Sequence, residues 1–368
     1  MRIGIIGAGQ LGQMLGFAAR AHGYTCLFLD PSAKPPAARI GPVIQARFDD
    51  RVALAVLADK CDVLTYEFEN VPVDALADVA DLVPIYPPLD ALRQAQDRLS
   101  EKQLFTALHI PIPEYRAIDS SDDLHDAAAA IGLPLVLKTR RLGYDGKGQF
   151  VLRSTGQVDE AWQDLGAKDL IAEQWVEFDY EASVIGVRSI SGDIVTYCLT
   201  RNEHADGILR ISRAPVEDAG LTEQANAHIR RLLRHLDYVG VLALELFVTG
   251  DRLLANEFAP RVHNSGHWTI EGAETSQFSN HVMAVAGAQP GPTGNRGHAG
   301  MVNLISHLPN AARQLTAGSL HDYGKTPRPG RKLGHITVVA DSAAARDRLI
   351  DEICDSVTKS SSQAGTAT

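Results

Sequence analysis

Two glutamates in one apolar segment are the residues best suited to chemistry. Glu245 and Glu257 stand twelve positions apart in the stretch 241–258, which consists of an apolar strand, a Thr-Gly-Asp turn and a second apolar strand. This pattern predicts a β-hairpin. A three-residue loop from Gly250 to Arg252 would place the glutamates directly opposite each other, with Cβ atoms roughly 5 Å apart. Paired carboxylates can bind Mg²⁺ beside nucleotide phosphates; two solvent-facing acids on an exposed hairpin are the alternative.

A glycine-rich loop, residues 143–149, joins two predicted strands. It is not a Walker loop, because that motif opens a helix. Its backbone donors could fold over phosphates as a lid, and Lys147 could add positive charge. Lys138 lies in the preceding apolar strand, where a lysine must face an anion or water. We expect a phosphate-contacting lid; a flexible exposed hairpin is the alternative.

Two further segments carry polar groups in positions suited to binding. The strand predicted at 169–176 ends in polar residues whose backbone could pair with an adenine edge, and Glu181 follows at a distance suitable for a ribose. By itself this pattern is also that of an ordinary strand. Residues 260–268, directly after the acidic hairpin, contain two histidines, an arginine and an asparagine. This density of donors predicts an anion-binding loop.

The N-terminus carries a complete G-x-G-x-x-G motif, Gly7 to Gly12, between a predicted strand and a helix. Asp30 ends the next strand, where a ribose-binding acid belongs, so the spacing is that of a dinucleotide site and of an oxidoreductase. A second interpretation is that the loop presents backbone N–H groups to another anion, such as a substrate phosphate. A third is that the glycines serve tight packing.

Composition excludes several classes of function. The chain has 368 residues and a net charge of −10, without a basic block of the kind that binds nucleic acid. No apolar run approaches the ~20 residues of a membrane span, and no signal-peptide pattern precedes the first strand. Four scattered cysteines form no CxxC pair, which disfavours structural zinc and disulfides and indicates a reducing cytoplasm.

The predicted helices and strands divide the chain into parts with different types of secondary-structure order. Strands and helices alternate at first in the rhythm of a parallel α/β sheet, and a single helix is expected from about 89 to 108. The segment that follows is predicted to be mixed α+β. Pro- and Gly-rich segments at 83–88 and 289–297 mark boundaries, and 359–368 has the composition of a disordered tail.

Taken together and in this order, the motifs resemble those of the ATP-grasp superfamily. Within it the chain is similar to the 5-(carboxyamino)imidazole ribonucleotide synthase family. The blocks that carry the resemblance are residues 7–12, 97–98 with 102–105, 143–149, 206–210, 256–257, 259–268 and 328–335.

The resemblance implies three domains and a homodimer. The domains would be a Rossmann-like pre-ATP-grasp domain (1–96), an ATP-grasp domain (97–290) and a small C-terminal domain (291–358), followed by the tail (359–368). The implied reaction is ATP-dependent carboxylation of 5-aminoimidazole ribonucleotide with bicarbonate, through carboxyphosphate, in purine synthesis. ATP and Mg²⁺, with two ions possible, are the implied cofactors. Another ATP-grasp ligase, such as a formate-using transformylase or a biotin carboxylase-like enzyme, and the oxidoreductase are the rivals.

The resemblance also assigns roles to single residues. ATP contacts fall on Arg98, Lys138, Gly143, Tyr144, Asp145, Gly146, Lys147, Gly148, Gln149, Glu173, Gln174, Trp175, Val176, Glu181, His204, Asn256 and Glu257, and Mg²⁺ ligands on Glu245 and Glu257. The catalytic residues would be Arg261, His263, Asp145 and Tyr144, and the substrate contacts Glu67, Asn264, Lys325, Arg331 and Lys332. Arg261 and His263 would hold bicarbonate, and Lys325 and Arg331 the ribose phosphate. Either Asp145 or His263 would take the amine proton.

Overall fold

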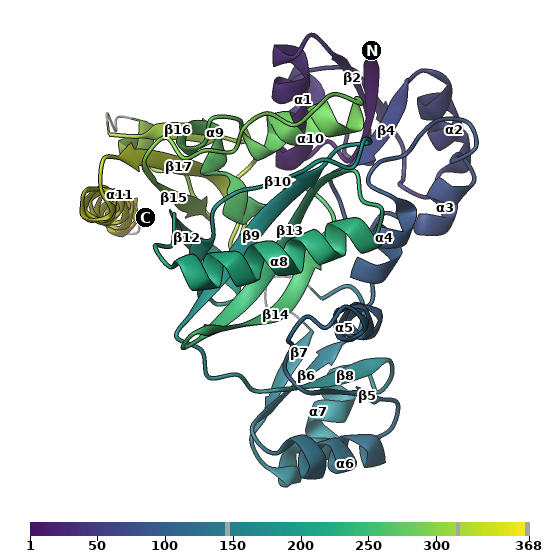
Figure 1. The fold of residues 1–368 in the computed structure, drawn as a ribbon, viewed down its shortest axis with the longest axis vertical. Coiled ribbons are helices and arrows are strands. Elements are labelled where there is room, and N and C mark those ends of the chain that lie inside the picture. The colour runs from purple at the N-terminus through teal and green to yellow at the C-terminus, as the bar shows by residue number, and fades with distance from the viewer. Residues whose placement is uncertain (144–147, 314–316, 365–368) are drawn as a thin grey trace.

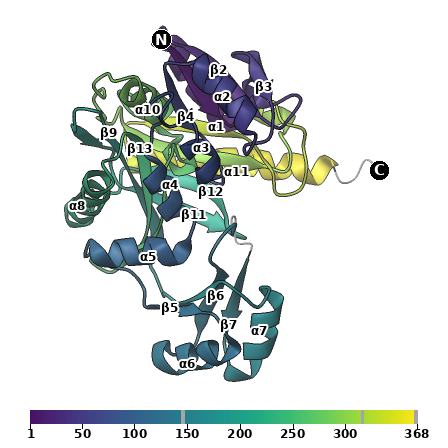
Figure 2. The ribbon, with the colours of Figure 1, turned by 90° about the vertical axis from the view of Figure 1, so that its right-hand side faces the viewer.

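A computed structural model gives the structure of the chain and describes residues 1–143, 148–313 and 317–364. Figures 1 and 2 show three sheets stacked along the long axis, with the N-terminal sheet at one end, a large sheet in the middle and a small lobe at the other end. The predicted mixture of α/β and α+β architecture is confirmed. Within the described ranges, no helix combines the length and the apolar character needed to cross a membrane.

The N-terminal part forms the predicted parallel sheet, with strand order β3-β2-β1-β4. Its central strands are apolar and buried because helices cover the sheet. The elements are β1 (Arg2–Ile6), α1 (Gln10–Ala21), β2 (Thr25–Asp30), η1 (Pro36–Arg39), β3 (Val43–Gln45), α2 (Arg51–Asp59), β4 (Val63–Tyr66), α3 (Val73–Ala77) and α4 (Leu89–Ala95).

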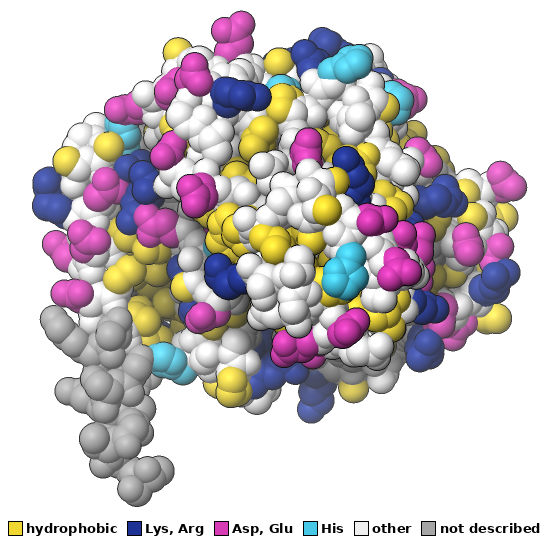
Figure 3. Space-filling view, turned by 90° about the horizontal axis from the view of Figure 1, so that it is seen from below, with side chains coloured by type: hydrophobic (Ala, Val, Ile, Leu, Met, Phe, Trp, Pro, Cys, Tyr) yellow, Lys and Arg dark blue, Asp and Glu magenta, His cyan; other side chains and the backbone are white. Residues whose placement is uncertain are grey.

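The small lobe is an antiparallel sheet of order β5-β8-β6-β7 with two helices packed against it. Figure 3 shows the molecule from this side, where Lys and Arg side chains are interspersed with Asp and Glu. Helix α5 (Arg98–Ala107) precedes the small lobe in the chain. The elements of the lobe are β5 (Tyr115–Ile118), α6 (Ser121–Ile131), β6 (Leu135–Thr139), β7 (Gln149–Leu152), η2 (Thr155–Gln157), α7 (Val158–Asp164) and β8 (Leu170–Gln174).

The large sheet has nine strands, eight of them in the order β14-β13-β9-β11-β12-β15-β17-β16, with β10 paired to β9. The amphipathic helix α8 covers one face, because its buried residues recur every three or four positions. The elements are β9 (Tyr180–Arg188), β10 (Ile194–Thr196), β11 (Thr200–Ala205), β12 (Ile208–Ala214), α8 (Ala219–His235), β13 (Gly240–Thr249), β14 (Arg252–Ala259), η3 (Asn264–Gly266), α9 (Thr269–Gly272) and α10 (Gln277–Val285).

The C-terminal segment continues the same sheet, because β12 pairs with β15. Its elements are β15 (His298–Ile305), η4 (Asn310–Arg313), β16 (Ser319–Asp322), β17 (Lys332–Ala340) and α11 (Ala343–Ala364). Helix α11 packs on β15 and β17. It also runs through residues 359–364, which the sequence composition assigned to a disordered tail.

The single helix expected from about 89 to 108 is wrong. The chain forms two helices, α4 and α5, because Asp97 leaves the helical conformation and caps α5. Its carboxylate accepts the backbone N–H groups of Leu99 and Ser100, at 3.0 and 3.4 Å. The Asp97 carboxylate also receives Arg140 at 3.1 and 2.8 Å, so the cap ties α5 to the end of β6.

The hairpin register is as predicted, but its turn is not. Glu245 pairs with Glu257, yet the β13–β14 turn contains two residues, Gly250 and Asp251, rather than three. Gly250 has a φ of +60°, as glycine at the first turn position permits. A β-bulge at Asn256 supplies the extra residue that brings the glutamates into register.

The cap of α5 yields a test of stability. We expect Asp97→Ala to lower the free energy of unfolding by about 3–5 kcal/mol. The substitution removes the cap of α5, and it also leaves Arg140 without its buried carboxylate partner. Asp50→Ala is the matched control, since Asp50 caps α2 from an exposed position; it should lose only about 1 kcal/mol. Urea denaturation measures both, and equal losses would contradict the role given to the arginine contact.

Candidate active site

A cleft of about 470 Å³ lies between the small lobe and the large sheet and reaches the N-terminal domain. Most of the predicted site residues line it. The described ones that do are Arg98, Lys138, Gly143, Gln149, Glu173, Gln174, Trp175, Val176, Glu181, His204, Glu245, Asn256, Glu257, Arg261, His263, Asn264 and Lys332. The predicted residues thus come from the sheet of the small lobe and from the large sheet, with the loops and helices beside them, and they meet at one cavity.

The other predicted residues divide into two groups. Glu67, Gly148, Lys325 and Arg331 are described but do not line the cleft. Tyr144, Asp145, Gly146 and Lys147 lie outside the described residues, so the predicted lid and the two candidate catalytic groups within it remain predictions.

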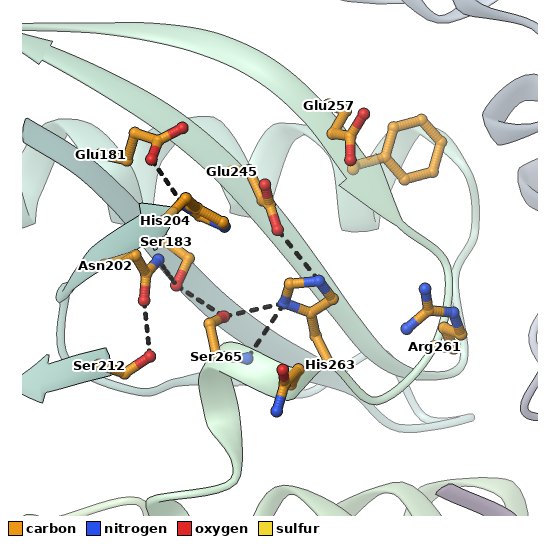
Figure 4. A network of polar contacts seen from close by, with 12 residues as sticks. Glu181, Ser183, Asn202, His204, Ser212, Glu245, Glu257, Arg261, His263 and Ser265 are labelled. Carbon is orange, nitrogen blue, oxygen red and sulfur yellow. Dashed lines mark hydrogen bonds and ion pairs between the residues drawn. The ribbon is translucent and has the colours of Figure 1, made fainter. Parts of the chain in front are cut away.

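The acidic hairpin presents its polar groups to the cleft. The bulge allows two consecutive residues, Asn256 and Glu257, to line the same cavity as Glu245. Each glutamate has a nitrogen donor beside it, since Glu245 lies 3.0 Å from His263 Nε2 and Glu257 lies 2.9 Å from Arg98 Nη1. Burial opposes ionisation of Glu245, but its interactions with His263, His204 and Lys332 lower its pKa to about 2. Figure 4 shows the two glutamates and the contact of Glu245 with His263.

A cluster of cations forms the opposite wall. Glu173 on β8 receives Lys138 at 3.0 Å and Lys102 at 3.3 Å, and Lys102 also donates to the carbonyl of Asn256 at 2.6 Å. Burial raises the pKa of Glu173, but the charges of the two lysines and of Arg98 outweigh it and bring the pKa to about 2. Burial also lowers the pKa of Lys138. Because three cations surround one carboxylate, this wall favours an anionic ligand.

A second polar pair stands on neighbouring strands of the large sheet. His204 Nδ1 on β11 lies 2.5 Å from a carboxylate oxygen of Glu181 on β9. Burial lowers the pKa of His204, but the hydrogen bond to Glu181 and the charge of Glu245 raise it above its ordinary value. Both residues face the cleft, as Figure 4 shows.

Arg261 lies between the cleft and the N-terminal domain. Its guanidinium pairs with Glu69 at 3.1 Å, and its side chain is only 17% exposed. Burial lowers the pKa of Arg261, yet nearby carboxylates, beginning with Glu69, raise it. A planar guanidinium held at the wall of a cleft can bind a carboxylate-like anion in bidentate fashion.

The backbone donors of the N-terminal glycine motif, Gly7 to Gly12, are used by hydrogen bonds within the protein. The N–H of Ala8 donates to Asp30 at 2.8 Å, and the N–H of Gly9 donates to Glu67 at 2.7 Å. A Cβ on Gly12 would lie 2.7 Å from the carbonyl oxygen of Gly7, so close packing requires glycine there. These contacts occupy the groups that would bind a pyrophosphate and a ribose, which favours the packing interpretation over a dinucleotide site.

The end of the cleft near this loop carries polar groups from the C-terminal segment. The amine of Lys325 contacts the side-chain oxygen of Gln10, which lines the cleft. Burial, and then the charge of Arg331, lower the pKa of Lys325 to about 8. Asn264 exchanges two hydrogen bonds with Asn303, at 3.1 and 2.8 Å, and is thereby fixed at the cavity wall.

Sequence reasoning missed several residues of this site. Lys102 and Glu101 are polar yet buried in α5, and Glu69 and Gln10 belong to the N-terminal domain. Lys102 stands one helical turn after Arg98, and that spacing could have indicated that both lie on one side of α5 and interact with the same carboxylate. Glu101 accepts the backbone N–H of Phe258 at 2.7 Å, a long-range contact that leaves no local pattern.

Comparisons with known proteins agree with the geometry. Three family models match: the ribonucleotide synthetase preATP-grasp domain (1–96), the ATP-grasp domain (103–278) and the phosphoribosylaminoimidazole carboxylase C-terminal domain (299–348). The fold and the cleft thus define an ATP-grasp enzyme.

The relatives narrow the class. N5-carboxyaminoimidazole ribonucleotide synthase of Pseudomonas aeruginosa is 47% identical over 356 residues, which cover 95% of this chain and 98% of the relative. The crystal structure of N5-carboxyaminoimidazole ribonucleotide synthetase from Thermus thermophilus is similar at a TM-score of 0.91 and 46% identity, covering 95% of this chain and 96% of that one. A structure of the Aspergillus clavatus synthase in complex with ADP and 5-aminoimidazole ribonucleotide gives a TM-score of 0.90, 31% identity and coverage of 97% and 98%. The chain belongs to the N5-carboxyaminoimidazole ribonucleotide synthase family.

Glu173 provides a test of the charge balance in the cleft. We expect Glu173→Gln to lower the free energy of unfolding at neutral pH by about 3 kcal/mol, because two buried lysines lose their counter-ion. The pKa of Glu173 falls from 4.5 to about 2 on folding, so this contribution is present above pH 4.5 and disappears as the pH falls towards 2. The difference between wild type and variant should therefore shrink in that range.

Chemical denaturation at a series of pH values measures the effect. Glu177→Gln is the control, since Glu177 is an exposed glutamate just after β8. It should change stability by less than about 0.5 kcal/mol at every pH. A difference for Glu173→Gln that does not depend on pH would contradict the assignment.

Proposed function

We propose that the chain uses ATP and bicarbonate to carboxylate the exocyclic amine of 5-aminoimidazole ribonucleotide, giving the 5-(carboxyamino) product, ADP and phosphate. The observation that carries the proposal is one cleft in which two opposed carboxylates face a wall of cations, with Arg261 and His263 beside them. The family to which the chain belongs supports this reaction over a transformylase or a biotin carboxylase-like one.

The cation wall fits the triphosphate of ATP. Lys138, Lys102 and Arg98 would neutralise phosphate charge, and the polar end of β8 would take the adenine. Two buried oxygens support a ligand with donor groups, because Glu173 Oε1 and Asn256 Oδ1 have no hydrogen-bond partner among the described residues. Glu181, which lines the cleft beside His204, would accept a ribose hydroxyl.

The acidic hairpin is suited to Mg²⁺. The part of the chain that the structure describes contains no group of three or more His, Cys, Asp or Glu able to hold a metal ion. A pair of carboxylates whose remaining ligands come from phosphates and water is nevertheless the usual Mg²⁺ arrangement beside a nucleotide. Glu245 and Glu257 fit this donor set. The ion would offset charge on the phosphates when bound.

For the reaction itself, the protein must mainly align the reactants and stabilise their charge, without forming a covalent intermediate. A bicarbonate oxygen attacks the γ-phosphorus, the bond to the β-phosphate breaks, and carboxyphosphate and ADP result. The amine nitrogen then forms a bond to the carboxyl carbon, phosphate leaves, and the amine loses one proton. Arg261 would hold the bicarbonate and carboxyphosphate anion. Water must be excluded because carboxyphosphate hydrolyses readily.

The aminoimidazole ribonucleotide would lie at the far end of the cleft. Lys325, Arg331 and Lys332 bring positive charge there and would bind its ribose phosphate, while Glu67 would approach the imidazole. A homodimer and a cytoplasmic location, the latter suggested by four scattered cysteines without a CxxC pair, also remain proposals. Light scattering of the purified chain tests the dimer.

The metal assignment predicts a loss of turnover. We expect Glu257→Gln to reduce ADP release in the presence of bicarbonate and aminoimidazole ribonucleotide by at least about 100-fold, because one Mg²⁺ ligand loses its charge. The fold should stay intact by circular dichroism. Asp251→Asn, in the turn of the same hairpin, is the control and should release ADP at the wild-type rate. Wild-type turnover in Glu257→Gln would refute the assignment.

The phosphate-binding role of Arg331 predicts a selective change in KM. Arg331→Ala should raise the KM for aminoimidazole ribonucleotide about tenfold or more, because a charge-assisted hydrogen bond is lost, and should leave the KM for ATP within about twofold. Steady-state assays of ADP release measure both constants, with the exposed Arg296→Ala as control. An unchanged ribonucleotide KM would remove the role.

A further inference from the structure

A chain of buried polar side chains lies behind His263. It consists of Ser212 on β12, Asn202 on β11, Ser183 on β9 and Ser265 in η3, and we name it the serine–asparagine chain. All four side chains are at most 3% exposed. Figure 4 shows the chain running across the sheet and ending at the imidazole.

The hydrogen bonds of this chain run in one direction. Ser212 donates to Asn202 Oδ1 at 2.8 Å, Asn202 Nδ2 donates to Ser183 at 2.9 Å, and the Ser183 hydroxyl donates to Ser265 Oγ at 2.8 Å. The Ser265 hydroxyl therefore keeps its own hydrogen for His263 Nδ1, which lies 2.9 Å away. The backbone N–H of Ser265 also donates to this nitrogen, at 3.3 Å.

Two donors on Nδ1 define the tautomer of His263. A nitrogen that accepts hydrogen bonds carries a lone pair, so in the neutral ring the proton must lie on Nε2. Nε2 is the atom that faces Glu245 at 3.0 Å. The ring thus presents a donor, not an acceptor, to the acidic hairpin.

The sheet fixes the chain in place. Side chains alternate along a strand, so Ser183 shares a face with Glu181, and Asn202 shares it with His204. Glu245 is directly opposite Ser183 in the β13–β9 register. The serine–asparagine chain and the cleft carboxylates therefore stand on one face, and a shift of the chain would require a shift of the strands that carry the site.

We propose that the serine–asparagine chain is a positioning device that holds His263 as its Nε2–H tautomer. His263 then donates its single ring N–H to the Glu245 carboxylate or to an anion beside it, and it does not accept the proton of the substrate amine. This inference rests on the proposed function and deepens it, because the sequence left Asp145 and His263 as equal candidates for that proton. Ser265 is accordingly a positioning residue for the carboxylation.

Nitrogen NMR of the full chain tests the tautomer without any substrate. The chain has 13 histidines, so ¹⁵N-histidine spectra of wild type and His263→Gln identify the His263 signals by difference. We expect an unprotonated Nδ1 and a protonated Nε2 in wild type. Ser265→Ala removes one donor and should produce a second population with Nδ1 protonated. A protonated Nδ1 in wild type, or a Ser265→Ala spectrum identical to wild type, would overturn the proposal.

Ser189→Ala is the matched control for this experiment. Ser189 is also a buried serine, with its hydroxyl 2.7 Å from that of Ser191, but it belongs to neither the serine–asparagine chain nor the cleft. Its substitution should leave the His263 signals unchanged. If Ser265→Ala does not fold, the wild-type spectrum and Ser183→Ala, one step further along, still decide the question.

Two substitutions of His263 itself separate a donor from a base. The amide nitrogen of glutamine can reach the place of Nε2, whereas that of asparagine reaches only the place of Nδ1. A donor role predicts that kcat of His263→Gln exceeds that of His263→Asn by about tenfold or more, the value of one hydrogen bond to a charged group. Equal losses would overturn the donor role. If wild type itself shows no carboxylation, the proposed function fails while the NMR result stands.

Discussion

The opposition of two carboxylates on paired strands is the constraint on which the rest of the structure depends. Two negative charges so close in a partly buried cleft repel each other strongly unless each has a hydrogen-bond donor or a cation beside it. Glu245 has His263 from the loop after the hairpin, and Glu257 has Arg98 from the start of α5. Because Asp97 sets where α5 begins, and is held by arginines at the end of β6, the charge balance of one hairpin links three distant segments.

The wall of the cleft around Glu173 has an excess of positive charge. Lysines are rarely buried, and here two of them share the single carboxylate of Glu173. The surplus of positive charge disfavours the empty cleft and favours a polyanion, which is what an ATP-dependent ligase must bind. The hairpin and the small lobe thus bring opposite charges to one cavity.

Local sequence patterns predicted many residues of this site, but they did not predict the backbone features that hold those residues in place. The two apolar strands around a turn in 241–258 and the spacing of the two acids gave the correct pairing of Glu245 with Glu257, although the register arises from a bulge and not from the loop. A bulge has no signature in apolar alternation, because Asn256 has the character of an ordinary polar position. The break before α5 was missed for a similar reason, since a capping aspartate inside a continuous helical pattern looks like one more surface acid.

Contacts between segments far apart in the sequence could not be predicted at all. Nothing local links Lys102 to Glu173, or Ser183 to Ser265, because sheet topology alone brings them together. The glycine motif shows the opposite error. Its spacing was suited to a dinucleotide, but only the fold reveals that Asp30 and Glu67 already occupy the loop.

The C-terminal strands have a consequence for how the protein is made. They complete the large sheet by pairing β15 with β12, on the side of the sheet away from the acidic hairpin. A nascent chain that has emerged only as far as α10 therefore exposes the whole edge of β12, and unpaired edges recruit other chains. That edge is covered only once β15 has been synthesised and has paired with β12.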